Sequence, residues 1–251
     1  MTHDLRAMCD AVFYVVRDGV EWRALPADFP PWDAVYAFYD RWSARGLPQA
    51  LVCRLREKLR VRQGRGAQPT ASNVDSQIVK AADTVPRASS GYHGGKKITG
   101  RGPVCRSRCR GLAAGAGGHC RQRQRPGRAK LLVIRLDAFG TLKIMWADSG
   151  YDGAPLAAWI RAVAGITLEV VRRCDPHAFQ VVRRRWVVER TFGWLMRYRR
   201  LARDYERLTA HHEAMVYWAT IMIMTRRLVR YQASQPPEQR WGGNRPQRAA
   251  A

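Results

Sequence analysis

The stretch TLKIMWADSGYDGAPLAAWIRAVAGITLEVV, residues 141–171, decides the fold class. Apolar side chains alternate with period two from Leu142 to Trp146, which predicts a strand, and the Ala-Asp-Ser-Gly turn that follows ends it. Residues 154–164 then predict a helix and residues 166–171 a second strand. Strands separated by a helix indicate an α/β core.

The segments on either side extend this core into a domain that we assign to residues 71–230. Residues 73–79 predict another strand, and residues 179–205 and 211–230 predict two long helices with apolar faces. Residues 231–251 are rich in Gln, Arg and Pro, so we expect them to form a disordered basic tail.

Residues 1–66 predict a separate, all-α unit. Apolar side chains at helical spacing predict three helices, over residues 3–18, 32–45 and 47–61, and a Gly, Gln and Arg-rich linker follows them. Three short helices with basic outer faces resemble a helix-turn-helix-like DNA-binding module. The alternative interpretation is a plain helical cap on the larger domain.

The composition favours a polyanionic partner. The 251 residues include 44 Lys and Arg but only 20 Asp and Glu, a formal net charge of +24. Neutralised phosphates release counterions, so nucleic acid is favoured over a membrane surface. The longest apolar run, Ala214 to Met224, is about half of the roughly 20 residues that cross a bilayer. Without a secretory signal or a regular cysteine framework, we expect a soluble cytoplasmic protein associated with the nucleoid.

Residues 102–128, GPVCRSRCRGLAAGAGGHCRQRQRPGR, are anomalous. They contain seven Arg, six Gly and three of the six Cys, without an acidic residue. Neither strand nor helix periodicity is present, so we expect no regular element here. Three explanations are open: a basic loop on DNA, a shifted reading frame, or a metal site. The ligands of that metal site would be Cys105, Cys109, His119 and Cys120.

Three acidic residues stand out by their context. Asp75 lies within a predicted strand, Asp148 ends the most regular strand, and Glu189 interrupts the apolar face of a helix. Carboxylates that converge from two strands and a helix can hold two divalent metal ions for phosphodiester chemistry. Hard oxygen ligands suit Mg²⁺. Taken singly, each signal is weak, because a turn Asp and a solvent-facing Glu are common.

Five blocks of sequence, in order, resemble bacterial insertion-sequence transposases of the IS-five family, within the IS-four-like superfamily. The blocks are VFYVVRDGVEWRALPADFPPW (12–32), VDSQIVK (74–80), GYHGGKKITGR (91–101), WADSGY (146–151) and RRWVVERTFGWLMRYRRLARDYE (184–206). The resemblance covers residues 10–101 and 129–225. It implies a ribonuclease H-like catalytic core with a DDE triad, in which Asp75, Asp148 and Glu189 are both the catalytic residues and the metal ligands.

The resemblance also implies a mechanism and partners. Such an enzyme binds the terminal inverted repeats of its element, cleaves DNA with Mg²⁺, for which Mn²⁺ can substitute, and joins the ends to target DNA. Pairing of two ends implies a homodimer on double-stranded DNA, and no membrane is involved.

Seven basic residues are candidates for DNA contacts. The family signature places an Arg four residues before the Glu, as Arg185 is, whereas its Tyr and Lys positions fall on Val182 and Met196. Arg197 is adjacent to the latter position. The remaining candidates are Lys96, Lys97, Arg101, Arg199 and Arg200.

The resemblance favours the shifted reading frame as the explanation of residues 102–128. Similar proteins have two apolar strands at this point, and the pattern resumes at Ala129 without apparent change of length. If paired frameshifts are present in the expressed chain, we expect the strands beside Asp75 to be lost. The alternative function is then a catalytically defective transposase remnant, or a DNA-binding inhibitor of transposition.

Overall fold

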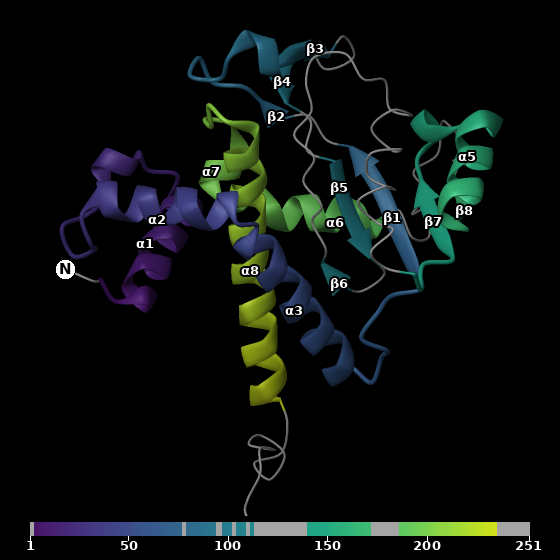
Figure 1. Ribbon diagram of the computed structural model, residues 1–251, viewed down its shortest axis with the longest axis horizontal. Helices are drawn as coiled ribbons and strands as arrows, with labels where there is room; N and C mark the ends of the chain where they lie inside the picture. Colours follow the sequence, from purple (N-terminus) through teal and green to yellow (C-terminus); the bar gives the residue numbers. More distant parts are fainter. Residues whose placement is uncertain are drawn as a thin grey trace, which may run out of the picture.

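The computed structural model describes residues 3–76, 79–93, 97–101, 104–108, 111–112, 140–171 and 186–234 (Figure 1). In this part of the chain, helices gather around one long C-terminal helix, and a mixed sheet lies on the other side of that helix. The predicted α/β class is confirmed.

The three predicted N-terminal helices are present. They are α1 (Leu5–Asp18), α2 (Trp32–Ala44) and α3 (Leu47–Arg62), with a 3₁₀ turn η1 (Trp22–Ala24) between the first two. The carboxylate of Asp4 caps α1 by accepting from the Ala7 amide at 3.1 Å. Gly19 ends α1 with φ of 73°, and a Cβ there would lie 2.8 Å from the Arg199 Cβ. Both the backbone conformation and the close approach therefore require glycine.

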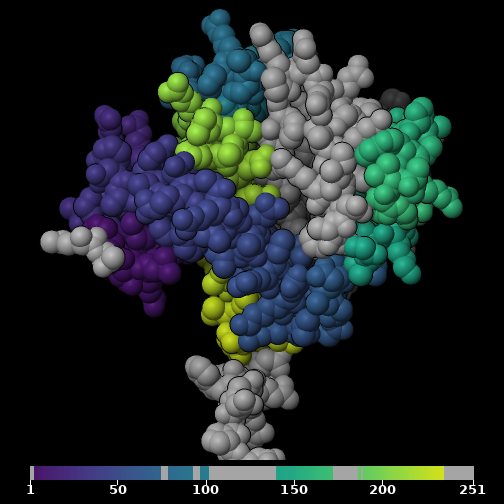
Figure 2. Space-filling model, in the orientation of Figure 1, coloured from purple at the N-terminus to yellow at the C-terminus, as the bar shows by residue number. Residues whose placement is uncertain are grey.

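The N-terminal helices share one hydrophobic core with the C-terminal helices. Helix α8 (Thr209–Ala233) packs against α1, α2 and α3, and Figure 2 shows α3 laid across it. Trp218 of α8 is 1% exposed and packs against the rings of Phe13, Phe38 and Trp42. Helices α1 to α3 are therefore not packed around a core of their own.

The main sheet has five strands in the order β6-β5-β1-β7-β8. Strand β1 pairs in parallel with β7, and β7 with β8, whereas β5 is antiparallel to β1 and to β6. Helix α5 (Ala154–Ala164) packs beside β8, and Leu156 and Ile160 enter the core over the sheet. The strands are β1 (Ala71–Ser76), β5 (Val104–Arg108), β6 (Gly111–Leu112), β7 (Ile144–Ala147) and β8 (Thr167–Val170).

Strands β5 and β6 correct the expectation for residues 102–128. We expected no regular element there, and no strand beside Asp75 if paired frameshifts are present, yet β5 pairs with β1 in the register Val74 to Arg106. The exposed edge of β1 supplies hydrogen-bond partners, so pairing forms a strand that the segment's own periodicity does not indicate. Residues 113–128 lie outside the described part of the chain, and the reading-frame origin of the stretch stays a prediction about the gene.

A second, three-stranded sheet has the order β2-β4-β3. Its strands are β2 (Val79–Lys80), β3 (Gly91–His93) and β4 (Ile98–Arg101), with η2 (Arg87–Ser89) before β3. Figure 1 shows this sheet above α7 (Arg199–Ala202). The helix expected over residues 179–205 is divided in the described part into α6 (Trp186–Leu195) and α7. Its residues 179–185 lie outside the described part.

Candidate active site

Asp75 and Asp148 occupy neighbouring positions at the carboxyl ends of two parallel strands. The register runs from Ala71 opposite Ile144 to Val74 opposite Ala147, and the next residue on each strand is the Asp. Adjacent strands are about 4.8 Å apart. The sheet therefore brings together two acidic positions that are 73 residues apart in the chain.

Asp148 is fixed by the turn that ends β7. Its Oδ1 accepts a hydrogen bond from the Gly150 amide at 3.2 Å, which caps η4 (Ser149–Tyr151). The buried Tyr151 anchors this turn in the core beneath the sheet. The Asp148 carboxylate is partly exposed, so it is accessible at the edge of the sheet.

Glu189 lies on α6, which packs against β1 and β5. Its side chain is exposed, whereas Val187 and Leu195 are buried on the opposite face of the helix. The side chain of Asp75 lies outside the described part of the structure. Among the side chains that are described, no group of three His, Cys, Asp or Glu is placed to hold a metal ion.

Arg101 is not available to DNA, which corrects its assignment as a DNA contact. The side chain is 0% exposed, and its guanidinium donates to the carbonyls of Glu206 at 2.7 Å and Arg207 at 2.8 Å. It also lies 3.5 Å from the Asp204 carboxylate. Arg101 therefore attaches the small sheet to the loop before α8.

Arg200 is a second correction. It is 8% exposed, its Nε donates to Glu206 Oε1 at 2.8 Å, and its Nη1 donates to the carbonyl of Val20 at 3.0 Å. A guanidinium with these partners stabilises the junction between α1, α7 and the loop. Arg200, like Arg101, therefore makes its contacts within the protein and not with DNA.

The other candidate DNA contacts divide by position. Lys97, Arg197 and Arg199 are exposed, as a phosphate contact requires. Lys97 has a φ of 49° in the turn before β4. Lys96 and Arg185 lie outside the described residues.

The sequence did not indicate the buried polar cluster around Asp204. His211 and His212, at the start of α8, are both buried. His212 Nδ1 lies 3.1 Å from Asp204 Oδ1, and His211 Nε2 lies 2.8 Å from Asp40 Oδ1. The available signal was a pair of acidic residues, Asp204 and Glu206, within a strongly basic segment.

The Asp204 carboxyl has a lowered pKa. Burial, the largest effect, would raise it, but the hydrogen bond and charge of His212, the Glu206 amide and the Arg101 charge together hold the pKa below 3.8. Asp204 is therefore a structural anion that joins the small sheet to α8.

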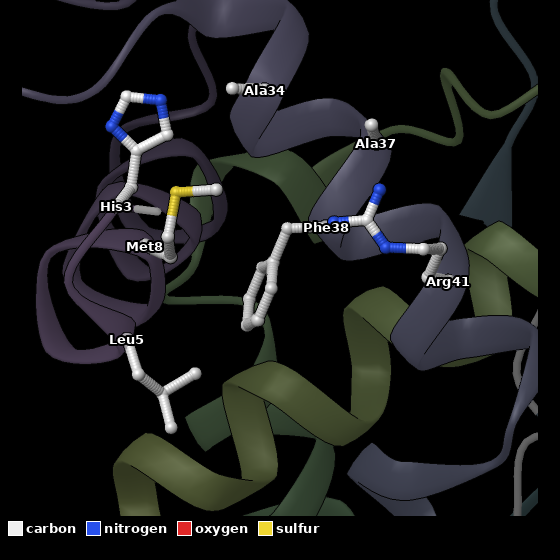
Figure 3. A pocket seen from close by; sticks show the side chains of 7 residues that line it. All are labelled: His3, Leu5, Met8, Ala34, Ala37, Phe38 and Arg41. Carbon is white, nitrogen blue, oxygen red and sulfur yellow. The ribbon is translucent and has the colours of Figure 1, made fainter. Parts of the chain in front are cut away.

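A hollow of about 420 Å³ lies between α1 and α2, and none of Asp75, Asp148 and Glu189 lines it (Figure 3). Its walls are mostly apolar and contain no carboxylate. The residues that line it are His3, Leu5, Met8, Ala34, Ala37, Phe38 and Arg41.

No helix among the described residues has the length and apolar character needed to cross a bilayer.

Comparison with known proteins identifies the family. Residues 1–52 match the family described as "Putative transposase of IS4/5 family", and residues 66–224 match "Transposase DDE domain". A Burkholderia cepacia protein named "Putative transposase for insertion sequence element IS402" is 35% identical over 74 residues. That match spans 30% of this chain and 35% of the relative, so the chain covers about a third of that protein's length. The predicted resemblance is confirmed, and because the second model matches more than half of the sequence, the chain belongs to the transposase DDE domain family.

Proposed function

We propose that this protein is a DNA transposase that binds the terminal inverted repeats of an insertion sequence, cuts the DNA and transfers the cut strand to target DNA. The observation that carries the proposal is the register of β1 and β7, which places Asp75 and Asp148 side by side. Membership of the DDE family supports it. The alternative of a defective remnant was based on a missing sheet edge, and β5 occupies that edge.

The catalytic core of this proposal is ribonuclease H-like. Its support is a sheet in which β6, β5 and β1 alternate in direction while β1, β7 and β8 are parallel. Asp75 lies near the carboxyl end of β1, Asp148 directly follows β7, and Glu189 lies on α6, which packs against β1 and β5. The proposed triad therefore comes from two central strands and one packed helix.

The donor chemistry of this triad fits divalent cations. Asp75 and Asp148 would hold Mg²⁺, or Mn²⁺ in its place, and Glu189 would complete the set of oxygen ligands. A bound cation supplies charge stabilisation for the leaving oxygen and a lowered pKa for bound water. The chain's own contribution is to orient the Asp148 carboxylate: its Oδ1 accepts from the Gly150 amide, and the buried Tyr151 anchors that turn in the core.

The N-terminal helices, residues 1–66, form the proposed helix-turn-helix-like part of the DNA surface. Arg41 and Arg45 near the end of α2, and Arg54 and Lys58 on α3, are exposed. These charges can neutralise phosphates without reading sequence. Lys97, Arg197 and Arg199 would extend the basic surface past the proposed active site.

The proposed reaction joins two ends of one element, so we propose that a homodimer assembles on the DNA. An enzyme that acts on an element within the bacterial chromosome works in the cytoplasm, at the nucleoid.

The test is cleavage of a supercoiled plasmid that carries the element's two ends. The Asp148→Asn variant should lose at least about 100-fold of the cleavage rate in Mg²⁺, because the metal set loses a charged ligand, while its affinity for the ends stays within about twofold of the wild type. The matched control is Asp152→Asn, an exposed Asp one turn beyond, which should cut normally. Equal cleavage by the wild type and Asp148→Asn would contradict the proposal.

A further inference from the structure

The hollow between α1 and α2 is an apolar site at the surface of the helical core. Ala34 and Ala37 lie one turn apart on α2, and their small side chains form part of one wall. Met8, which is 7% exposed, and Phe38, which is 5% exposed, also line the hollow, and Leu5 of α1 is 56% exposed beside them (Figure 3). The hollow is therefore shaped to accept an apolar side chain of a partner.

The hollow lies in the acidic part of a basic chain. Residues 1–40 contain seven Asp and Glu against three Arg, a net charge of −4, whereas the remaining residues carry +28. Asp4 lies one turn before Met8, and Asp33 lies one turn before Ala37, so two exposed carboxylates flank the hollow. This charge favours a cationic partner surface and disfavours the phosphates of DNA.

Asp4 and Asp33 can pair with such a partner while they hold their own helices. One oxygen of Asp4 accepts from the Ala7 amide at 3.1 Å, and one oxygen of Asp33 accepts from the Ala34 amide at 2.9 Å. A carboxylate accepts hydrogen bonds at both oxygens, so each can also accept from a guanidinium. Arg41 lines the hollow one turn beyond Ala37, which directs the cations of a partner to the end that Asp33 borders.

The C-terminal end of α8 carries a surface that complements the hollow. Arg226, Val229, Arg230 and Ala233 follow one another at helical spacing, so they form one stripe, and all four are exposed. Val229 is 58% exposed, and the two guanidinium groups flank it on this stripe. An apolar side chain between two cations matches an apolar hollow between two carboxylates.

The stripe cannot enter the hollow of its own chain. Helix α8 is continuous from Thr209 to Ala233, and the Phe38 ring of the hollow packs against Trp218 near its middle. Val229 lies 11 residues beyond Trp218, which is about 16 Å along an α-helix. Figure 1 shows this end of α8 extending away from α1 and α2. The stripe can therefore enter only the hollow of a second molecule.

We propose that two copies of this chain associate through these surfaces, with Val229 of each copy in the hollow of the other. Arg226 and Arg230 then pair with Asp4 and Asp33 across the interface. A twofold axis makes this helix-in-groove contact twice, so the assembly closes as a dimer. The inference rests on the proposed function, which calls for two copies on the DNA, but the contact itself uses no DNA.

The first experiment measures the mass of the full-length chain by sedimentation without DNA, in about 0.15 M salt, where charge repulsion is screened beyond about 8 Å. We expect a monomer–dimer equilibrium. Ala37→Leu fills the hollow and should weaken the dimer at least about 10-fold, because Val229 can no longer be buried there. Ala44→Leu, the same change at an exposed position at the end of α2, is the matched control and should dimerise like the wild type.

Charge reversal tests which surfaces meet. Arg230→Glu and Asp33→Arg should each weaken the dimer about 5- to 30-fold, because an attractive pair becomes repulsive in both contacts, and the double variant should recover most of the affinity. Arg161→Glu, at an exposed position on α5, changes the net charge equally and should leave the dimer intact. Circular dichroism should show the same helical content in every variant, so a lost dimer would not reflect a lost fold.

The outcomes separate the interface from the proposed function. A monomeric wild type would leave the hollow to a partner other than a second copy and would overturn the inference, as would a dimer that persists in Ala37→Leu and Arg230→Glu. In either case, loss of cutting in Asp148→Asn would still uphold the transposase proposal. A dimer that both variants lose, together with no DNA cutting by the wild type, would support the interface and contradict the enzymatic proposal.

Discussion

Replacing Arg101 with Met should destabilise the fold rather than weaken DNA binding. The Arg101 side chain is 0% exposed and holds three groups of the loop before α8: the carbonyls of Glu206 and Arg207, and the Asp204 carboxylate. Met fills a similar volume but donates no hydrogen bond. The variant therefore leaves the buried Asp204 carboxylate without the Arg101 guanidinium and two carbonyls without that donor.

The magnitude follows from these contacts. Each hydrogen bond from a charged donor contributes about 1.5–3 kcal/mol, so the two bonds, at 2.7 and 2.8 Å, amount to about 3–6 kcal/mol. Removing one partner of a buried ion pair costs about 3–5 kcal/mol by a separate line of measurement. We expect a loss of about 3–5 kcal/mol, a large share of the 5–15 kcal/mol that is typical of a folded domain.

Urea unfolding followed by circular dichroism measures this loss as a lower midpoint at unchanged slope. Arg6→Met is the matched control, because Arg6 is 88% exposed and 3.8 Å from Asp10, and it should change stability by less than about 0.5 kcal/mol. Arg101→Lys should also be destabilised, since an ammonium cannot reproduce the guanidinium fork. Wild-type stability in Arg101→Met, together with weaker DNA binding, would refute the reasoning and restore Arg101 as a DNA contact.

Three further predictions test the fold and the site. Folding lowers the pKa of Asp204, so the ionised carboxylate stabilises the folded state fully above its unfolded pKa, and this contribution declines as the pH falls through the lower folded value. The fall in the free energy of unfolding between about pH 5 and pH 3 should therefore be shallower in Asp204→Asn than in the wild type, as urea unfolding at each pH would measure. Trp218→Ala should cost about 3–5 kcal/mol, seen as a lower melting temperature, because Trp218 is 1% exposed at the centre of the helical core; an unchanged melting temperature would contradict that placement. Chelation of divalent ions should abolish DNA cutting and leave binding of the ends intact, with cutting restored by Mg²⁺; cutting that persists in excess chelator would contradict a carboxylate metal site.

Periodicity predicted most of the helices and the strands β1, β7 and β8, and its failures share a physical cause. The helices over residues 5–18, 32–44 and 154–164 each bury one apolar stripe, so the stripe in the sequence identifies them. Strand β5, VCRSR, has no such pattern, and its pairing with β1 is a long-range effect that no local window contains. The register that aligns Asp75 with Asp148 is likewise a property of the assembled sheet. Sequence similarity suggested those two residues, but only the pairing places them side by side.

The roles of the basic residues were harder to predict, because in a chain with so many Arg residues the sequence does not distinguish a buried Arg from an exposed one. Arg101 and Arg200 look like ordinary members of a basic surface, yet they are buried against Asp204 and Glu206. Acidic residues are scarce in this chain, so an acidic residue within an Arg-rich segment is a candidate for a specific role. Its burial then distinguishes a structural ion pair from an accessible carboxylate. Asp204 and Glu206 are buried and hold the helices to the small sheet, whereas Glu189, in the same segment, is exposed on a helix packed against β1. An exposed carboxylate on a helix packed against a central strand is what the proposed metal-dependent site requires of its third acid, and burial is what distinguishes Glu189 from Asp204 and Glu206.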